Sequence, residues 1–393
     1  MLKRVTLLGL AALAAGPATA NGWRVQPEAT VEGRVFLSDP AFGGQESGPQ
    51  GTLILSGTAD WRSDDRNWIG KLEPYARIDS LDKERNLFDL REASLTYRGR
   101  QTQLSGGIGQ FFWGVAESRN VVDVLNQIDA TEDVDGAQKL GQPFLRVSQR
   151  TDIGTFDAYY LPVFRERDFP GQVDRLRTNP LVNDDARYGR DGEQTAGDFA
   201  LRYTEQFDAF DLGLSAFHGT SRDPVLRFSG GALTPFYPEL NQVGVDAVRV
   251  DGAWLFKGEL AAGVVGGEGF TAAVAGAEYT LYGVTDGGAD LGLIAEWLYD
   301  DRDGANQPLT PLDNDLFVGT RFVLNDFSDT ELLFGGFYDP DTQGMQASAE
   351  FSRRVGDQTL LELEGRLFDA GDDTLIQTLE DDDLMTLRLT RFF

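Results

Sequence analysis

Apolar and polar residues alternate with period two in short segments along most of the chain. The last eleven residues, 383–393, show this clearly, because Met385, Leu387 and Leu389 are separated by polar residues. Successive side chains of a β-strand point to opposite faces, so such a segment predicts a strand with one apolar and one polar face. About eighteen segments fit this pattern, or sixteen if the weakest is not a strand. The chain is therefore predicted to be all-β.

The connections between these segments alternate in length. Counted from the N-terminus, every long connection has an odd position, and the even connections are short turns. The long connections are 38–51, 110–143, 165–197, 219–242, 300–314 and 369–382. The short ones lie around Asp64, Gly99, Asp152, Asp208, Gly258, 283–288, Asp326 and Gly356. A soluble sandwich or propeller has no reason to sort its loops in this way. Short turns at one end and long loops at the other are typical of a transmembrane antiparallel β-barrel, with periplasmic turns and extracellular loops.

The chain ends on Phe393, which is in phase with the apolar face of the final segment. An amphipathic last strand that ends in phenylalanine resembles the closing strand of Gram-negative outer-membrane β-barrels. This resemblance implies that Phe393 is part of the signal read by the barrel insertion machinery. It also implies an outer-membrane location, with membrane lipids and lipopolysaccharide as partners.

Composition agrees with a barrel in an exported protein. The 393 residues include no cysteine, so disulfides and cysteine-based zinc sites are excluded. The formal net charge of −28 argues against nucleic-acid binding, which requires a basic surface. After the first twenty residues, no apolar run reaches the roughly 18 residues that a membrane-spanning helix needs.

Residues 1–20 have the pattern of a cleaved secretory signal. Lys3 and Arg4 precede an apolar stretch at 5–15, and the small residues 18–20 form a cleavage site. The apolar stretch is too short for an anchor helix. We therefore expect a mature chain of residues 21–393 that forms one barrel.

The strand phases also assign side chains to the two faces of the wall. Aromatic residues such as Trp68, Trp254 and Trp297 lie near strand ends on the apolar face, as expected at membrane interfaces. The polar face is predicted to line the lumen, with acidic and basic residues nearly balanced. The lumenal candidates are Glu73, Arg77, Glu92, Arg98, Arg249, Arg321, Glu364 and Arg366. Most of the net negative charge must then lie in loops and turns.

The insertion at 110–143 is the strongest candidate for a functional loop. Porins typically fold one loop into the lumen to narrow it, and this insertion resembles such a constriction loop. A short helix is expected at 115–127. The candidate constriction residues are Trp113, Glu117, Arg119, Asn120 and Asp123. Alternatively, the insertion is an ordinary surface loop or a plug helix. The stretch 112–120, which reads FWGVAESRN, also resembles FWG-x-x-E-S-x-N in proteobacterial barrel proteins. That resemblance implies no particular substrate.

Three other features have both a functional and a simpler interpretation. Arginines in 165–197 could select anions or hold lipopolysaccharide phosphates, but interleaved acids favour a self-paired, solvated loop. Acidic clusters such as the one at Asp133 and Asp135 could bind calcium, but none has a complete calcium-loop spacing, so a solvated acidic rim is favoured. His218, with Thr220 and Ser221 nearby, could suggest an outer-membrane lipid hydrolase, although a rim histidine is the simpler reading.

Together these features predict a porin-like channel for passive diffusion of small hydrophilic solutes or ions, with a weak cation preference. We expect no enzymatic activity, cofactor or resident metal, and either a monomer or a homotrimer. The alternative from another class is a closed barrel that acts as a structural or polysaccharide-binding protein. A lipid hydrolase is the remote alternative.

Overall fold

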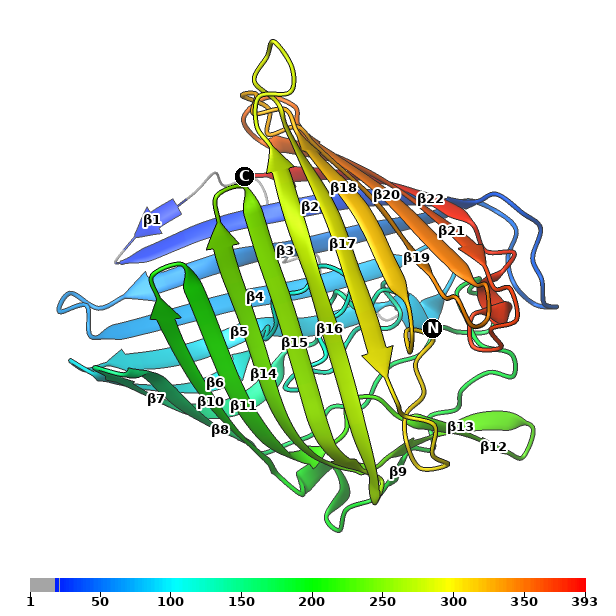
Figure 1. Ribbon diagram of the computed structural model, residues 1–393, viewed down its shortest axis with the longest axis horizontal. Coiled ribbons are helices and arrows are strands. Elements are labelled where there is room, and N and C mark those ends of the chain that lie inside the picture. Colours follow the sequence, from blue (N-terminus) through cyan, green and yellow to red (C-terminus); the bar gives the residue numbers. More distant parts are fainter. Residues whose placement is uncertain (1–17, 21) are drawn as a thin grey trace, which may run out of the picture.

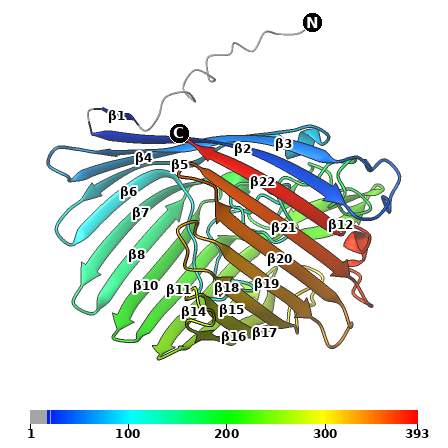
Figure 2. The same cartoon turned by 90° about the horizontal axis from the view of Figure 1, so that it is seen from above.

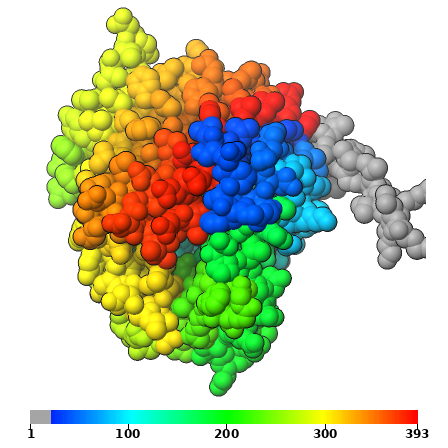
Figure 3. Space-filling view, turned by 90° about the vertical axis from the view of Figure 1, so that its right-hand side faces the viewer, coloured from blue at the N-terminus to red at the C-terminus, as the bar shows by residue number. Residues whose placement is uncertain are grey.

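The computed structural model describes residues 18–20 and 22–393 of the chain. In this part, eighteen antiparallel strands form a closed barrel (Figure 1). The barrel closes where the first strand, β2 (Trp23–Phe36), pairs with the last, β22 (Leu384–Phe392). In Figure 3 the blue surface of the N-terminal strands adjoins the red surface of the C-terminal ones. The predicted all-β barrel and its strand number are confirmed.

The other barrel strands follow one another along the wall (Figure 2). They are β3 (Gln50–Arg62), β4 (Trp68–Asp79), β5 (Leu87–Arg98), β6 (Thr102–Gly109), β7 (Gln142–Thr151), β8 (Gly154–Leu161), β10 (Asp198–Phe207), β11 (Phe210–Thr220), β14 (Glu239–Asp251), β15 (Trp254–Val265), β16 (Glu268–Leu281), β17 (Asp290–Asp300), β18 (Leu316–Val323), β19 (Glu331–Tyr338), β20 (Met345–Arg354) and β21 (Thr359–Asp369).

Several short elements lie outside the wall. A small sheet over the long-loop end combines β9 (Arg187–Tyr188) with the hairpin β12 (Val225–Ser229) and β13 (Ala232–Tyr237). Three 3-10 turns occur in the described residues: η2 (Lys83–Arg85), η3 (Glu193–Thr195) and η4 (Gln377–Leu379). No helix in the described part of the chain is long and apolar enough to span a membrane. Most of the predicted signal lies outside the described residues, except β1 (Ala18–Ala20), which pairs with the start of β2.

The long connections all lie at one end of the barrel, as predicted. One boundary was wrong: the turn expected at Gly258 is at 252–253, and Gly258 lies within β15. A second unexpected turn, Gly266–Gly267, joins β15 to β16 at the long-loop end. Both of these glycines have positive φ, of 62° and 90°, a conformation that favours glycine.

The two faces of the wall differ in chemistry. Met385, Leu387 and Leu389 of β22 are exposed on the outside, while Thr386 and Thr390 are buried inside. Aromatic pairs also cover the outer face, such as Trp68 with Tyr97 and Trp254 with Tyr279, whose ring centroids are 5.0 and 4.7 Å apart. The buried apolar clusters lie mainly within the barrel, where inserted loop residues pack against inward-facing side chains.

Candidate functional site: the barrel lumen

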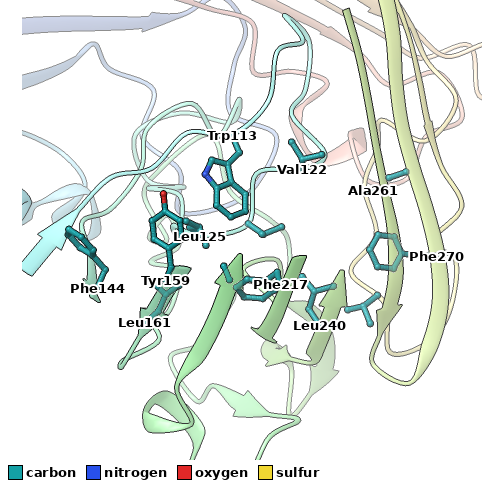
Figure 4. Close-up of a cluster of buried hydrophobic side chains, with 14 residues drawn as sticks. Trp113, Val122, Leu125, Phe144, Tyr159, Leu161, Phe217, Leu240, Ala261 and Phe270 are labelled. Carbon is teal, nitrogen blue, oxygen red and sulfur yellow. The ribbon is translucent and has the colours of Figure 1, made fainter. Parts of the chain in front are cut away.

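The connection 110–141 between β6 and β7 lies inside the barrel, and its apolar side chains pack against the wall. Figure 4 shows Trp113, Val122 and Leu125 among inward-facing residues of β7, β8, β11 and β14. Val122 and Leu125 have no exposed surface, and Trp113 is only 6% exposed. Burying such side chains stabilises the inserted position by roughly 1.5–3 kcal/mol each. The apolar residues of this insertion are therefore buried within the lumen.

The helix predicted at 115–127 does not form. Instead, wall carboxylates accept hydrogen bonds from consecutive backbone N–H groups of residues 115–118, which we call the pinned segment. Glu259 of β15 accepts from the N–H of Val115 and Ala116 at 2.6 and 2.9 Å. Glu296 of β17 accepts from the N–H groups of 117 and 118 at 2.8–3.1 Å. The segment that follows is also irregular, and its Val122 and Val124 are buried in the apolar cluster.

The five candidate constriction residues do not form one ring. Glu117 lies 2.7 Å from Arg321 of β18 and 3.5 Å from Lys257 of β15. Arg119 pairs with Asp300 at 3.0 Å, at the end of β17. These contacts join the inserted loop to the wall on the β15–β18 side.

The remaining three candidates have different surroundings. Trp113 is buried beneath Arg202, whose guanidinium lies 5.1 Å from the ring centroid, so it offers no open stacking surface. Asp123 pairs with Lys139 in the same connection. Burial raises the pKa of the Asp123 carboxyl, although Lys139 opposes that rise. Asn120 is exposed.

Residues 129–135, which we call the acidic segment, are held by arginines of the opposite wall. Arg77 of β4 pairs with Asp129 at 2.8 Å and also with Glu132. Arg366 of β21 pairs with Asp133 at 3.3 Å and with Asp135 at 2.6 Å. Burial raises the pKa of Glu132, but the surrounding arginines, Arg77 first, outweigh it and hold the pKa at about 2.

The sequence interpretation of this region was wrong in one respect. Asp133 is 7% exposed and is paired with arginine, so it does not belong to a solvated acidic rim. Arg85 of η2 also donates to the backbone carbonyl of Thr131 at 2.6 Å. Arg34 of β2 donates to the carbonyl of Glu132 at 3.0 Å. The contacts of Arg34 and Arg85 with this segment could not be identified from the sequence, because their partners lie 98 and 46 positions away along the chain.

The same charge network extends across the strand pair that closes the barrel. Arg388 of β22 lies 2.7 Å from Glu32 of β2 and 3.0 Å from Glu364 of β21. Glu32 also pairs with Arg85 at 3.2 Å. The closing strands are therefore joined by inward-facing charges in addition to their backbone ladder.

Most of the predicted lumenal residues lie on the inward face. Arg77, Arg321, Glu364 and Arg366 make the contacts described above. Glu92 and its cross-strand neighbour Glu73 face inward, and Glu92 lies 3.4 Å from Lys71. Arg98 follows on the same face of β5, at its short-turn end.

Arg249 does not lie in the lumen. It pairs across the ladder with Phe210 and Phe256, in phase with the outward-facing Val243 and Val245. Its nearest charged partner is Asp251, at 3.7 Å, and both side chains are exposed. The phase error follows from the missed turn at 252–253. Without that turn, residues 248–254 read as one continuous strand in which Arg249 and Trp254 fall on opposite faces.

Four arginines of the second insertion pair with carboxylates, whereas Arg177 is buried against backbone carbonyls and Arg187 is exposed. Arg175 is 3% exposed and lies 2.6 Å from Asp382, whereas Arg165 reaches Asp89 of β5 at 2.7 Å. These contacts tie residues 162–197 to other loops and to the wall. The predicted self-paired, solvated loop is therefore wrong, because the carboxylate partners lie outside 165–197 and the ion pairs form part of the packed cover of the long-loop end.

His218 lies on the outer face, where its Nδ1 is 2.7 Å from the side-chain oxygen of Asn241. This partner could not be identified from the sequence, because Asn241 is brought alongside only by the pairing of β11 with β14. The two neighbouring hydroxyls are engaged elsewhere: Ser221 donates to the carbonyl of Asp223, and Thr220 is buried beside Arg190. No group of three or more potential metal ligands occurs among the described residues.

No protein-family model matches this chain, and no curated protein matches it. Solved structures of other barrels do match this chain. A BenF-like porin from Pseudomonas fluorescens is 10% identical, with 95% of this chain and 97% of that chain covered and a TM-score of 0.58. Acinetobacter baumannii OccAB1 is 7% identical, with 94% and 96% covered and a TM-score of 0.56.

Another similar structure is Escherichia coli Wzi, described as an outer-membrane, carbohydrate-binding β-barrel involved in group 1 capsule assembly. It is 13% identical, with 92% of this chain and 83% of that chain covered and a TM-score of 0.54. At such low identities these likenesses establish the fold alone, and the resemblance at 112–120 stays a prediction.

Proposed function

We propose that the protein is an outer-membrane channel for passive diffusion of small hydrophilic solutes or ions. The observation that carries this proposal is a closed eighteen-strand barrel with an apolar outer face and a charged inner face. An apolar band around a polar interior suits a wall between lipid and water. The porin fold of two similar structures supports the proposal.

In this proposal, the exported chain enters the outer membrane through the insertion machinery, which reads the last strand and Phe393. The short turns face the periplasm, and the long loops face outward among lipopolysaccharide. The inserted connection 110–141 narrows the lumen. Glu117, Arg119, Asn120 and Asp123 are its polar groups, while the buried Trp113 fixes its position. The acidic loops raise the local cation concentration at the mouth, which gives a weak cation preference.

Conductance of the refolded protein in a planar bilayer, with a salt gradient, tests this function. We expect stable conductance steps and a reversal potential that indicates modest cation preference. An anion-biased reversal potential would contradict the selectivity but leave the channel intact. A folded barrel that gives no steps would contradict the channel itself.

The second candidate is a closed barrel that acts as a structural or polysaccharide-binding protein. The dense pairing of lumenal charges favours it, because the acidic segment and its arginines fill part of the lumen. The carbohydrate-binding Wzi shows that a barrel of similar fold can have such a role. A silent but correctly folded barrel that retains a polysaccharide would support this candidate. The lipid-hydrolase alternative would require lipase activity that is lost in His218→Ala.

A further inference from the structure

A polar cavity of about 890 Å³ lies on the inner wall beside the pinned segment. It is lined by residues of β7, β8, β10, β11 and β14, and Val115 of the inserted loop forms part of its boundary. Its volume is in the range of about 300–1,000 Å³ that is typical of small-molecule sites. A solute in this cavity would therefore lie next to the inserted loop that narrows the lumen in the proposed channel.

The charged groups in the cavity wall are largely paired with one another. Arg202 and Asp246 form a bidentate pair at 2.6 and 2.8 Å, and they are 9% and 5% exposed. Arg146 donates from Nε and Nη2 to Asp157 at 2.9 and 2.7 Å. Because these guanidinium groups are already neutralised by wall carboxylates, they are poorly suited to attract a free anion.

The other charged groups that line the cavity disfavour anions further. They are one arginine, Arg150, and three carboxylates, Asp152, Glu205 and Asp211. Apart from these, amides and hydroxyls dominate the lining. They include Gln101, Gln103, Ser148, Thr155, Thr204 and Gln206. Each amide and each hydroxyl can both donate and accept a hydrogen bond.

We propose that this cavity is a binding subsite for neutral polyhydroxylated solutes of monosaccharide size. A sugar hydroxyl is both donor and acceptor, and so matches an array in which fixed Arg–Asp pairs alternate with amides and hydroxyls. A solute with a carboxylate would meet a net negative lining and no unpaired buried arginine. The inference deepens the proposed channel function and rests on it for its physiological meaning.

Blockage of ion current by matched probes tests the proposal. Glucose and sorbitol are expected to reduce the current in a concentration-dependent way, and glucuronate to be at least about tenfold weaker. Replacing Arg146 by Met together with Asp157 by Ala leaves the net charge unchanged but removes a hydrogen-bonding pair. The half-blocking glucose concentration should then rise about tenfold, as expected for the loss of one or two hydrogen bonds to charged groups.

The matched control is Lys71→Met with Glu92→Gln, which removes another inward-facing pair of opposite charges that does not line this cavity. It should retain the wild-type response to glucose. Equal blocking by glucose and glucuronate, or an unchanged response in the Arg146/Asp157 variant, would overturn the proposal. If the barrel conducts no ions, the channel fails first, and saturation-transfer NMR of glucose with the protein in detergent micelles decides the subsite separately. Absence of a transfer signal there would overturn it as well.

Discussion

The two halves of the inserted connection are held in opposite ways. In the pinned segment, wall carboxylates bind backbone N–H groups, as Glu296 does with residues 117 and 118. In the acidic segment, wall arginines bind side-chain carboxylates, as Arg77 does with Asp129. Contacts to the backbone do not depend on which side chains the loop carries, whereas ion pairs depend on charge at both ends. The backbone contacts of residues 115–118 should therefore survive substitution of the loop side chains, although Glu117 adds an ion pair with Arg321, and the acidic segment should respond to pH and charge.

Among the substitutions that test this difference, Arg77→Ala should have the largest effect on stability. Arg77 has a side chain with no exposed surface, and its removal leaves Asp129 and Glu132 buried without their main partner. Breaking a buried pair in this way costs about 3–5 kcal/mol. We expect a lower temperature for the heat-induced mobility shift on electrophoresis and larger, noisier conductance steps. Arg353→Ala is the control, because its 3.5 Å contact with Asp326 is at an exposed turn and is worth less than about 1 kcal/mol. Equal behaviour of the two variants would contradict the anchoring role.

Acid should weaken the acidic segment selectively. The pKa of Glu132 is depressed to about 2 from an ordinary value of 4.5, so the folded state favours the charged form. The resulting stability, about 3 kcal/mol, is fully present above the unfolded pKa and is lost as pH falls toward 2. Unfolding temperature measured from pH 6 down to pH 2 should show this loss. Arg77→Ala should lose much less over the same range, and an equal loss would point to other carboxylates.

The opposite pH dependence is expected at the loop carboxylate Asp315. Burial first, and then the neighbouring Asp339 and Asp313, raise the pKa of Asp315 to about 7. Its folded state therefore favours the protonated form, and stability falls as pH rises from about 4 to 7. Asp315→Asn should reduce that decline in stability. Because the pH dependence of Asp315 is opposite to that of Glu132, the two effects can be separated.

Glu296→Gln should have an intermediate effect on the pinned segment. The carboxylate of Glu296 accepts from two backbone N–H groups and from the Ser118 hydroxyl, at 2.6–3.1 Å. The neutral amide keeps one acceptor oxygen and presents an N–H₂ group to the same donors, at a cost of roughly 1.5–3 kcal/mol. Single-channel recordings should show added fluctuation. Glu92→Gln, another inward-facing carboxylate, is the control and should leave the recordings steady. Indistinguishable recordings from both would show that residues 117 and 118 are held mainly by apolar packing.

Much of the fold followed from the sequence, because period-two alternation and loop length are local properties. The inserted connection could also be recognised, since its buried valines need an apolar environment. The partners that hold it could not. Glu259 and Glu296 bind backbone groups, which have no sequence signature. Arg34 and Arg388 come together around Glu132 only when the barrel closes. The burial of Trp113 likewise depends on packing with β8 and could not be read from its position.

The error at Arg249 shows how a missed turn changes a functional assignment, and it leads to the smallest expected effect. A two-residue turn at 252–253 makes Asp251 and Trp254 cross-strand partners on one face, so the phase reverses between even and odd positions. Arg249 then faces outward, with an exposed contact to Asp251 at 3.7 Å. Arg249→Ala should therefore change stability by less than about 1 kcal/mol and leave conductance and ion selectivity unchanged. Arg321→Ala is the matched comparison, because Arg321 faces inward and lies 2.7 Å from Glu117. If Arg249→Ala altered selectivity as strongly as Arg321→Ala, the register of β14 and β15 would have to be revised.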